Sequence, residues 1–143
     1  MEGQEKIVLD ASVVVKWFSQ EEGSDLALEV KNQYVEGELI ILSADLLIYE
    51  VSNALMFNLD FDQEDVANAV KDIFDLDLDL ITPIEEILIR ATEYASENNL
   101  TIYDSCYISL AEMMGIPLYT ADGKLLENTE DLDFVKSLKY LQG

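Results

Sequence analysis

The sequence contains no histidine and only one cysteine among its 143 residues. Without histidine, the chain can form neither a Ser-His-Asp nor a Cys-His catalytic site, and it cannot bind zinc through imidazole. The single cysteine, Cys106, cannot form an internal disulfide, and we expect it to be a small core residue. Any catalysis must therefore use carboxylates, hydroxyls, lysines or a bound cation.

Basic residues are also scarce. Eight lysine and arginine residues stand against 30 acidic ones, which gives a formal net charge of −22. This charge argues against broad, non-specific attraction to a phosphate backbone. No apolar run approaches the roughly 20 residues of a membrane span, and the N-terminal MEGQEK has no signal-peptide pattern. Half of the residues are hydrophobic, so we expect one globular, cytoplasmic domain over residues 1–143, with no membrane association.

Apolar strands alternate with amphipathic helices along the chain. Strands are expected over 7–9, 39–43, 75–81 and 117–120, and a last helix and strand after residue 122. Helices are expected over 12–18, 24–37, 45–58, 62–74, 83–98 and 104–114. Repeated βα units of this kind predict an α/β fold with a parallel sheet and helices on both faces. In such sheets, ligands bind at the carboxyl ends of the strands.

Local signals support several of these boundaries. Ser24 is expected to cap its helix, and Thr82 with Pro83 is expected to open another. Gly37 and Gly115 suit the position that follows a helix. The alternating DLDLDLI at 75–81 could suggest a calcium loop, but it lacks the glycine and distal glutamate of an EF-hand, so it favours a strand with one solvated face.

Four acidic residues stand in apolar surroundings. Asp10 and Asp122 each follow an apolar strand, in IVLD and IPLYTAD. Glu50 lies in the apolar stripe of its helix, and Asp104 heads the stripe of another. Each has a plainer interpretation: a helix cap for Asp10 and Asp104, a turn for Asp122, and a buried ion pair for Glu50.

Four carboxylates held together would repel one another. At about 5 Å and an effective dielectric near 20, each ionised pair costs roughly 3 kcal/mol. Six such pairs exceed the net stability of a domain. Either the acids are apart, or some are protonated, or a divalent cation lies among them. An all-oxygen site without histidine suits Mg²⁺ or Mn²⁺.

These stretches together resemble a PIN domain of the VapC type, the toxin half of a bacterial or archaeal toxin–antitoxin pair. The matching segments are DASVVVKWF at 10–18, LLIYEVSNAL at 46–55, LTIYDSCYISLAEMMG at 100–115 and PLYTADGKL at 117–125. The resemblance covers essentially the whole chain and implies a three-layer PIN-like fold. Ser105 and Gly123 depart mildly from it, since they stand where a small apolar and often a basic residue are expected.

The same resemblance implies roles for particular residues. Its catalytic and metal-binding carboxylates match Asp10, Glu50, Asp104 and Asp122. Its supporting polar residues match Ser12, Asn53 and Thr120. Glu50 is the most plausible general base. Lys16, one short helix after the first aspartate, either meets a phosphate or is a solvated lysine.

The expected activity is Mg²⁺- or Mn²⁺-dependent hydrolysis of RNA by an endoribonuclease. The resemblance also implies a homodimer and a cognate antitoxin protein that pushes a basic segment into the site. One alternative is a PIN fold that binds a partner without cutting RNA, which the shortage of basic residues keeps open. Another is a receiver-like phosphoacceptor domain, suggested by Thr120 and Lys124. Against it, Asp10 is followed by Ala and Ser, and strand 75–81 has no Asp at its exit.

Overall fold

The computed structural model describes residues 4–141, so both ends of the expected domain 1–143 lie outside it. Its centre is a five-stranded sheet of order β3-β2-β1-β4-β5, and all four neighbouring pairs are parallel. The strands are β1 Glu5–Leu9, β2 Leu39–Ala44, β3 Asp79–Ile81, β4 Leu118–Thr120 and β5 Val135–Ser137. The predicted α/β class with a parallel sheet is confirmed. Receiver-like sheets have the order 2-1-3-4-5, so the topology excludes that alternative.

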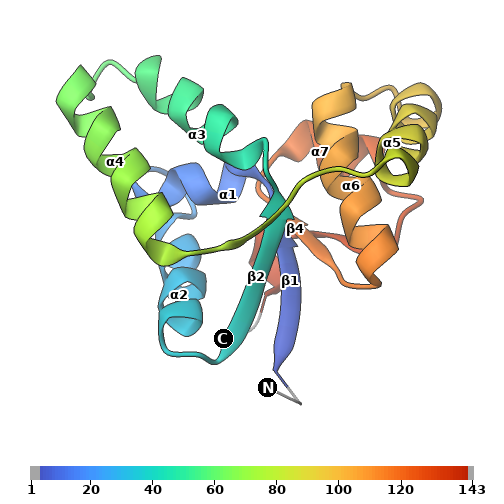
Figure 1. The fold of residues 1–143 in the computed structure, drawn as a ribbon, viewed down its shortest axis with the longest axis horizontal. Coiled ribbons are helices and arrows are strands. Elements are labelled where there is room, and N and C mark those ends of the chain that lie inside the picture. Colours follow the sequence, from blue (N-terminus) through green and yellow to red (C-terminus); the bar gives the residue numbers. More distant parts are fainter. Residues whose placement is uncertain (1–3, 142–143) are drawn as a thin grey trace.

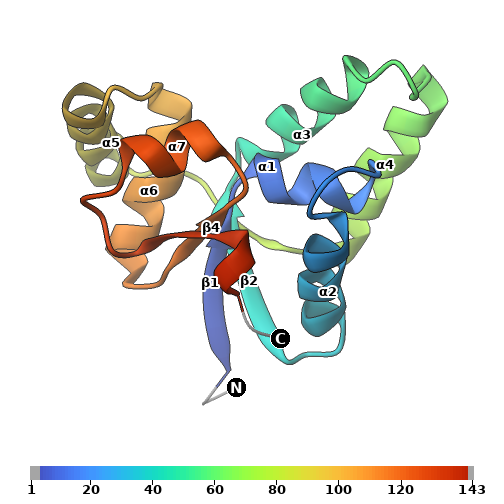
Figure 2. The same ribbon diagram turned by 180° about the vertical axis from the view of Figure 1, so that it is seen from behind.

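Helices cover both faces of this sheet. Within residues 4–141 they are α1 Ala11–Val14, α2 Ser24–Val35, α3 Leu47–Met56, α4 Gln63–Leu76, α5 Glu85–Asn98, α6 Ile102–Met114 and α7 Gly123–Asn128, with 3₁₀ turns η1 Val15–Trp17 and η2 Leu138–Tyr140. Figures 1 and 2 show α1 to α4 on one side of the sheet and α5 to α7 on the other. The expected three-layer architecture is therefore confirmed.

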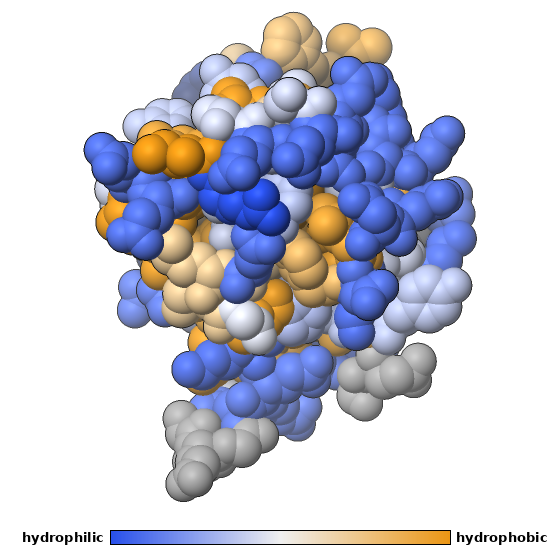
Figure 3. All heavy atoms as spheres, turned by 90° about the vertical axis from the view of Figure 1, so that its right-hand side faces the viewer, coloured by the Kyte–Doolittle hydropathy of each residue, from blue (hydrophilic) through white to orange (hydrophobic). Residues whose placement is uncertain are grey.

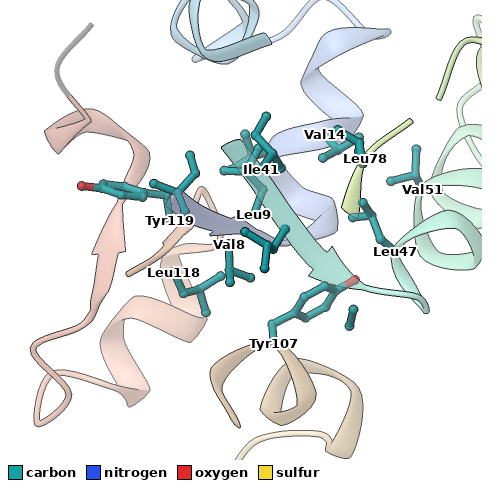
Figure 4. Packing of buried hydrophobic residues seen from close by; sticks show 14 of the residues in the cluster. Val8, Leu9, Val14, Ile41, Leu47, Val51, Leu78, Tyr107, Leu118 and Tyr119 are labelled. Atoms are coloured by element: carbon teal, nitrogen blue, oxygen red, sulfur yellow. The ribbon is translucent and has the colours of Figure 1, made fainter. Parts of the chain in front are cut away.

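The strands are apolar because both faces of the sheet are buried. Ile7, Val8 and Leu9 of β1 are fully buried. Figure 4 shows side chains of β1, β2 and β4 packed against residues of α1, α3 and α6, with Tyr107 of α6 placed near the carboxyl end of β2. This packing fixes the strand ends and the helices that follow them.

The strand predicted over 75–81 is too long at its start. Helix α4 continues through Leu76, and the strand begins only at Asp79. The buried residues of α4 recur at helical spacing as far as Ile73, and Leu76 extends the same face onto the core. Asp77 then ends the helix with φ 54°. Burial of one face of α4 thus decides the structure at the start of this segment, against its period-two pattern. Asp75, Asp77 and Asp79 are exposed, as expected.

Some helix starts also differ from prediction. Ser24 does not cap α2: Gly23 holds that position with φ 85°, and the Ser24 hydroxyl donates to the Ser19 carbonyl instead. Helix α5 begins at Glu85, two residues later than Pro83 predicts. The segment 12–18 is a single α-turn that passes into η1.

The predicted helix ends are confirmed at two glycines. Gly37 has φ 78° and Gly115 has φ 68°. Glycine adopts these left-handed conformations without steric strain because it has no Cβ. The amide of Ile116 donates to the Ala111 carbonyl, which closes α6 and directs the chain into β4. Cys106 of α6 is buried, as expected.

Helices α5 and α6 form the outer layer on their side, and Figure 3 shows this face as mainly hydrophilic with apolar patches. Arg90 of α5 connects the two helices: its Nε donates to Glu112 Oε1 at 2.8 Å, and its guanidinium lies 4.2 Å from the centre of the Tyr94 ring.

Among residues 4–141, no helix is both long and apolar enough to cross a bilayer.

Candidate active site

The four predicted acids lie along the carboxyl edge of the sheet. Asp10 directly follows β1, and Asp122 follows the neighbouring parallel strand β4, so both lie at the same edge. Glu50 comes from the first turn of α3, after β2, and Asp104 from the first turn of α6. The charges of Asp104 and Asp122 act on Asp10, and that of Asp104 acts on Glu50. The structure thus brings the acids within electrostatic reach of one another.

Asp10 is the innermost of these acids and is only 4% exposed. Its Oδ1 accepts from the Ser12 amide at 3.1 Å and from the Ser12 hydroxyl at 2.6 Å. Its Oδ2 accepts from the Thr120 hydroxyl at 2.6 Å. The predicted helix cap is therefore real, because the Ser12 amide belongs to α1. The carboxylate is nevertheless held by more than its cap.

The two hydroxyl groups have defined proton directions. The Ser12 hydroxyl accepts from the Ala121 amide at 2.9 Å, and the Thr120 hydroxyl accepts from the Asp122 amide at 3.1 Å. Because an amide can only donate, each hydroxyl has its own proton free to donate to Asp10. The loop after β4 thereby orients both donors. A carboxylate has about four acceptor positions, so these three bonds leave one open on Oδ2.

The environment of Asp10 disfavours its negative charge. Burial raises the pKa of the Asp10 carboxyl from 3.8 to about 6, and repulsion from Asp104 and Asp122 acts in the same direction. The bonds from Ser12 and Thr120 oppose this rise only in part. Within the described residues, no lysine or arginine forms an ion pair with Asp10. Among residues 4–141, no basic side chain therefore neutralises its negative charge.

Glu50 is held by a residue that the sequence did not single out as functional. The Tyr107 hydroxyl donates to Glu50 Oε1 at 2.6 Å. Burial and the neighbouring carboxylate raise the pKa of the Tyr107 phenol far above its ordinary value, so it stays a donor. Burial also raises the pKa of Glu50, and Asp104 adds to the rise while the Tyr107 bond opposes it. A signal was present: in the stripe that Asp104 heads, Tyr107 is the residue with a hydroxyl donor.

Asp104 and Asp122 lie farther out and are partly exposed. Asp104 is not the cap of α6, because Thr101 fills that role by accepting from the Asp104 amide at 3.0 Å. Burial and the charge of Asp122 raise the pKa of Asp104, and Lys124 opposes the rise. Asp122 caps α7, with its Oδ1 accepting from the Lys124 and Leu125 amides. Lys124 therefore lies near the acids without forming an ion pair among the described residues.

Two other expectations need correction. The supporting role expected of Asn53 stays a prediction, since its side chain is exposed and makes no hydrogen bond within residues 4–141; Ala54 is exposed as well. The buried stripe of α3 is Leu47, Val51 and Leu55, so Glu50 lies at its edge rather than within it. Lys16 is not a solvated lysine: its Nζ bonds Glu21 Oε1 at 2.9 Å and the Glu22 carbonyl at 2.6 Å.

The donor set fits a hard divalent cation. All candidate ligands are carboxylate oxygens, and the buried Asp10 keeps an open acceptor position and lacks a counter-charge. In residues 4–141, no three acidic or cysteine side chains converge into a ready-made metal cage. Mg²⁺ commonly binds through only one or two carboxylates while keeping several water ligands. An open site of this kind therefore suits Mg²⁺ or the similar Mn²⁺ better than an ion that needs a complete protein cage.

Comparison with known proteins gives a consistent pattern. The PIN domain family matches residues 7–131. Ribonuclease VapC3 of Pyrobaculum aerophilum is 29% identical over 126 residues, which cover 85% of this chain and 93% of that protein. The crystal structure of Mycobacterium tuberculosis VapC20, described as a sarcin-ricin loop cleaving toxin, has a TM-score of 0.69 at 13% identity, covering 90% of this chain and 96% of the other. A toxin–antitoxin complex from Klebsiella pneumoniae has a TM-score of 0.63 at 16% identity, covering 84% of this chain and 89% of the other.

Proposed function

The chain belongs to the PIN-domain family, and we propose that it is a metal-dependent endoribonuclease of the VapC toxin type. The observation that carries the proposal is the state of Asp10. This carboxylate is buried, oriented by Ser12 and Thr120, repelled by two further acids and, among residues 4–141, paired with no basic side chain. A stable fold tolerates such a group where it serves a site.

We assign the cation to Asp10 and Asp104, with Glu50 and Asp122 beside them. When bound, Mg²⁺ or Mn²⁺ would acidify a water molecule and offset the negative charge that develops on the phosphate. Lys124, near Asp104, places a second positive charge beside the acids. Ser12 and Thr120 keep the Asp10 oxygens in a fixed orientation throughout the reaction.

Glu50 is the proposed general base. Its Oε1 accepts the Tyr107 hydrogen bond, which leaves Oε2 to take a proton from the attacking water. Its raised pKa brings it closer to neutral pH, where a general base is most effective. The water oxygen forms a bond to phosphorus while the bond from phosphorus to the leaving ribose oxygen breaks, and that oxygen takes up a proton from solvent water.

The substrate class follows from the relatives and from the charge. The name of the Pyrobaculum relative describes a ribonuclease. A chain of net charge −22 is poorly suited to gripping a long duplex through many phosphates. We therefore expect cleavage of single-stranded or looped RNA, whose splayed nucleotides can reach the carboxylates.

The test is cleavage of defined single-stranded RNAs with Mn²⁺, Mg²⁺ or EDTA. Asp10→Asn and Asp104→Asn should lose activity by orders of magnitude. Asp75→Asn is the matched control, since it removes the same charge from an exposed position on α4. Metal-dependent cutting that persists in Asp10→Asn would identify a contaminating nuclease. Metal and partner binding without any cutting would instead favour the alternative of a non-cleaving binding module.

We also propose an antitoxin partner with a basic segment. The structural neighbour from Klebsiella is a toxin–antitoxin complex, and an arginine fork would suit the uncompensated carboxylates. Association should be fast at low salt and slow markedly as salt rises. Saturating Mn²⁺ should compete with the partner. An affinity unchanged by Mn²⁺ and by Asp104→Asn would place the partner elsewhere.

A further inference from the structure

Two hollows adjoin beside the candidate active site. The first, of about 300 Å³, lies between α1 and α3 and reaches Ser12, the donor to Asp10. The second, of about 410 Å³, lies between α2, α7 and η2 and reaches Lys139. Lys16 and Ala121 line both. We call these two adjoining hollows together, from Ser12 to Lys139, the lysine groove.

The charge of the groove differs from that of the chain. Its two hollows are lined by two lysines, Lys16 and Lys139, and by two acids, Glu21 and Glu22, whereas the chain has 8 basic and 30 acidic residues. Lys16 forms part of the groove wall and is not free to bind a ligand, because its Nζ pairs with Glu21 and its side chain is only 12% exposed. Lys139 is exposed and forms no ion pair within residues 4–141. Its charge is available to a ligand.

Strand register places Lys139 at the same edge as the acids. Thr120 of β4 pairs with Ser137 of β5, and Thr120 donates to Asp10. Lys139 follows Ser137 by two residues, and its amide donates to the Ser137 hydroxyl at 3.3 Å. It therefore lies just beyond the carboxyl end of β5, on the edge where β1 and β4 present Asp10 and Asp122.

We propose that the lysine groove binds the phosphate backbone of the RNA strand next to the bond that is cut, with Lys139 contacting a phosphate. This inference rests on the proposed ribonuclease function. A strand whose phosphodiester reaches Asp10 must continue over the neighbouring surface, and most of that surface repels phosphate. The groove begins at Ser12, is lined by as many lysines as acids, and offers Leu26 as an apolar contact for a sugar or base.

The experiment uses a fluorescent single-stranded oligoribonucleotide with Mn²⁺, and it measures kcat, KM and the salt dependence of binding. Lys139→Gln should raise KM about fivefold, the scale of one exposed ion pair, with kcat nearly unchanged. The slope of log affinity against log salt should shrink by about 0.7, the value for one phosphate contact on a single strand. Lys139→Arg should retain both values. Glu22→Gln should change KM in the opposite direction, because it removes one of the two acids that line the groove.

Lys71→Gln is the matched control, since Lys71 is an exposed lysine of α4 that does not line the groove. Equal effects of Lys139→Gln and Lys71→Gln on KM and salt slope would overturn the proposal while leaving the ribonuclease function intact. A wild-type protein that neither binds nor cuts RNA with Mn²⁺ would overturn both. If Lys139→Gln weakened binding of the antitoxin but not of RNA, the groove would be a protein-binding site and the proposal would be wrong.

Discussion

The phenol of Tyr107 donates a 2.6 Å hydrogen bond to Oε1 of Glu50, and this bond joins α6 to α3 across the candidate active site. The Tyr107 ring is 1% exposed, and Figure 4 shows it within the packed core. The donor is therefore fixed by the fold. Glu50 consequently presents one oxygen to the interior and keeps the other for the site.

Removing the Tyr107 hydroxyl should change both chemistry and stability. The bond lowers the pKa of Glu50 against the rise caused by burial, so Tyr107→Phe should raise that pKa further. If Glu50 is the base, the acidic limb of the kcat/KM profile then moves to higher pH, because the base must lose its proton to act. Unfolding free energy should fall by about 1 kcal/mol. RNA cleavage across pH and thermal melting measure these two effects.

Tyr94→Phe provides the control for this prediction. Tyr94 is similarly buried, and its hydroxyl donates to the Glu112 carboxylate, away from the four acids. Its loss should cost comparable stability without shifting the pH profile. Equal shifts in the two variants would mean that Tyr107 acts only through general packing.

The metal-free protein should lose stability as pH rises from about 4 to about 6. The pKa of Asp10 is about 6 in the folded chain and 3.8 ordinarily, so between these values the folded state holds the proton more tightly. Its contribution is complete below 3.8 and is lost as pH passes through 6. A difference of about two pKa units corresponds to about 3 kcal/mol. Urea unfolding in EDTA at several pH values measures this loss.

Asp10→Asn tests the origin of that slope. The amide cannot ionise, so the decline of stability between pH 4 and 6 should flatten in this variant. Asp75→Asn, an exposed change, should leave the slope as in the wild type. A decline that persists unchanged in Asp10→Asn would assign it to other carboxyl groups.

Mn²⁺ should raise the melting temperature. A cation would relieve the repulsion among the acids, and a ligand at a hundredfold excess over Kd adds about 2.7 kcal/mol to stability. Asp104→Asn should lose most of this gain, whereas Asp75→Asn should keep it. An identical Mn²⁺ response in wild type and Asp104→Asn would contradict the assignment of the metal to these acids.

Thr120→Val should weaken the site and the fold together. Thr120 is fully buried, donates to Asp10 and accepts from the Asp122 amide. Valine of similar size removes the donor to Asp10 Oδ2 and the acceptor for the Asp122 amide, at a cost of about 1–3 kcal/mol for the buried Asp10 oxygen. Thr129→Val is the comparison, since this buried threonine donates to the Leu125 carbonyl instead. Only Thr120→Val should also reduce Mn²⁺ affinity, measured by calorimetry.

The alternation of strands and helices was predictable because each element carries its own pattern of apolar residues. β1, β2 and β4 are buried on both faces and therefore appear in the sequence as short apolar runs. The segment at 75–81 was not predictable in the same way. There a period-two pattern and a helical face compete for the same residues, and the packing of Leu76 against the core decides between them.

The candidate site was predictable as far as strand ends determine it. Asp10 and Asp122 follow adjacent parallel strands, so their proximity is a consequence of topology. The Tyr107 bond to Glu50 was not predictable, because it depends on how α6 packs against α3. The environment of Lys16 likewise depends on the loop at Glu21 and Glu22. The conformation of this loop could not be predicted, because a loop has no periodic pattern of apolar residues.

The hydrogen bond from Thr120 to Asp10 joins residues 110 positions apart in the chain. During synthesis, Asp10 emerges from the ribosome long before Thr120 and Asp122 have been translated. A growing chain therefore cannot complete the hydrogen bonds of Asp10 or gather the four acids before Thr120 and Asp122 have been made. An amino-terminal fragment that stops before Thr120 lacks one donor to Asp10 and one of the four acids, so no such fragment can contain the complete site.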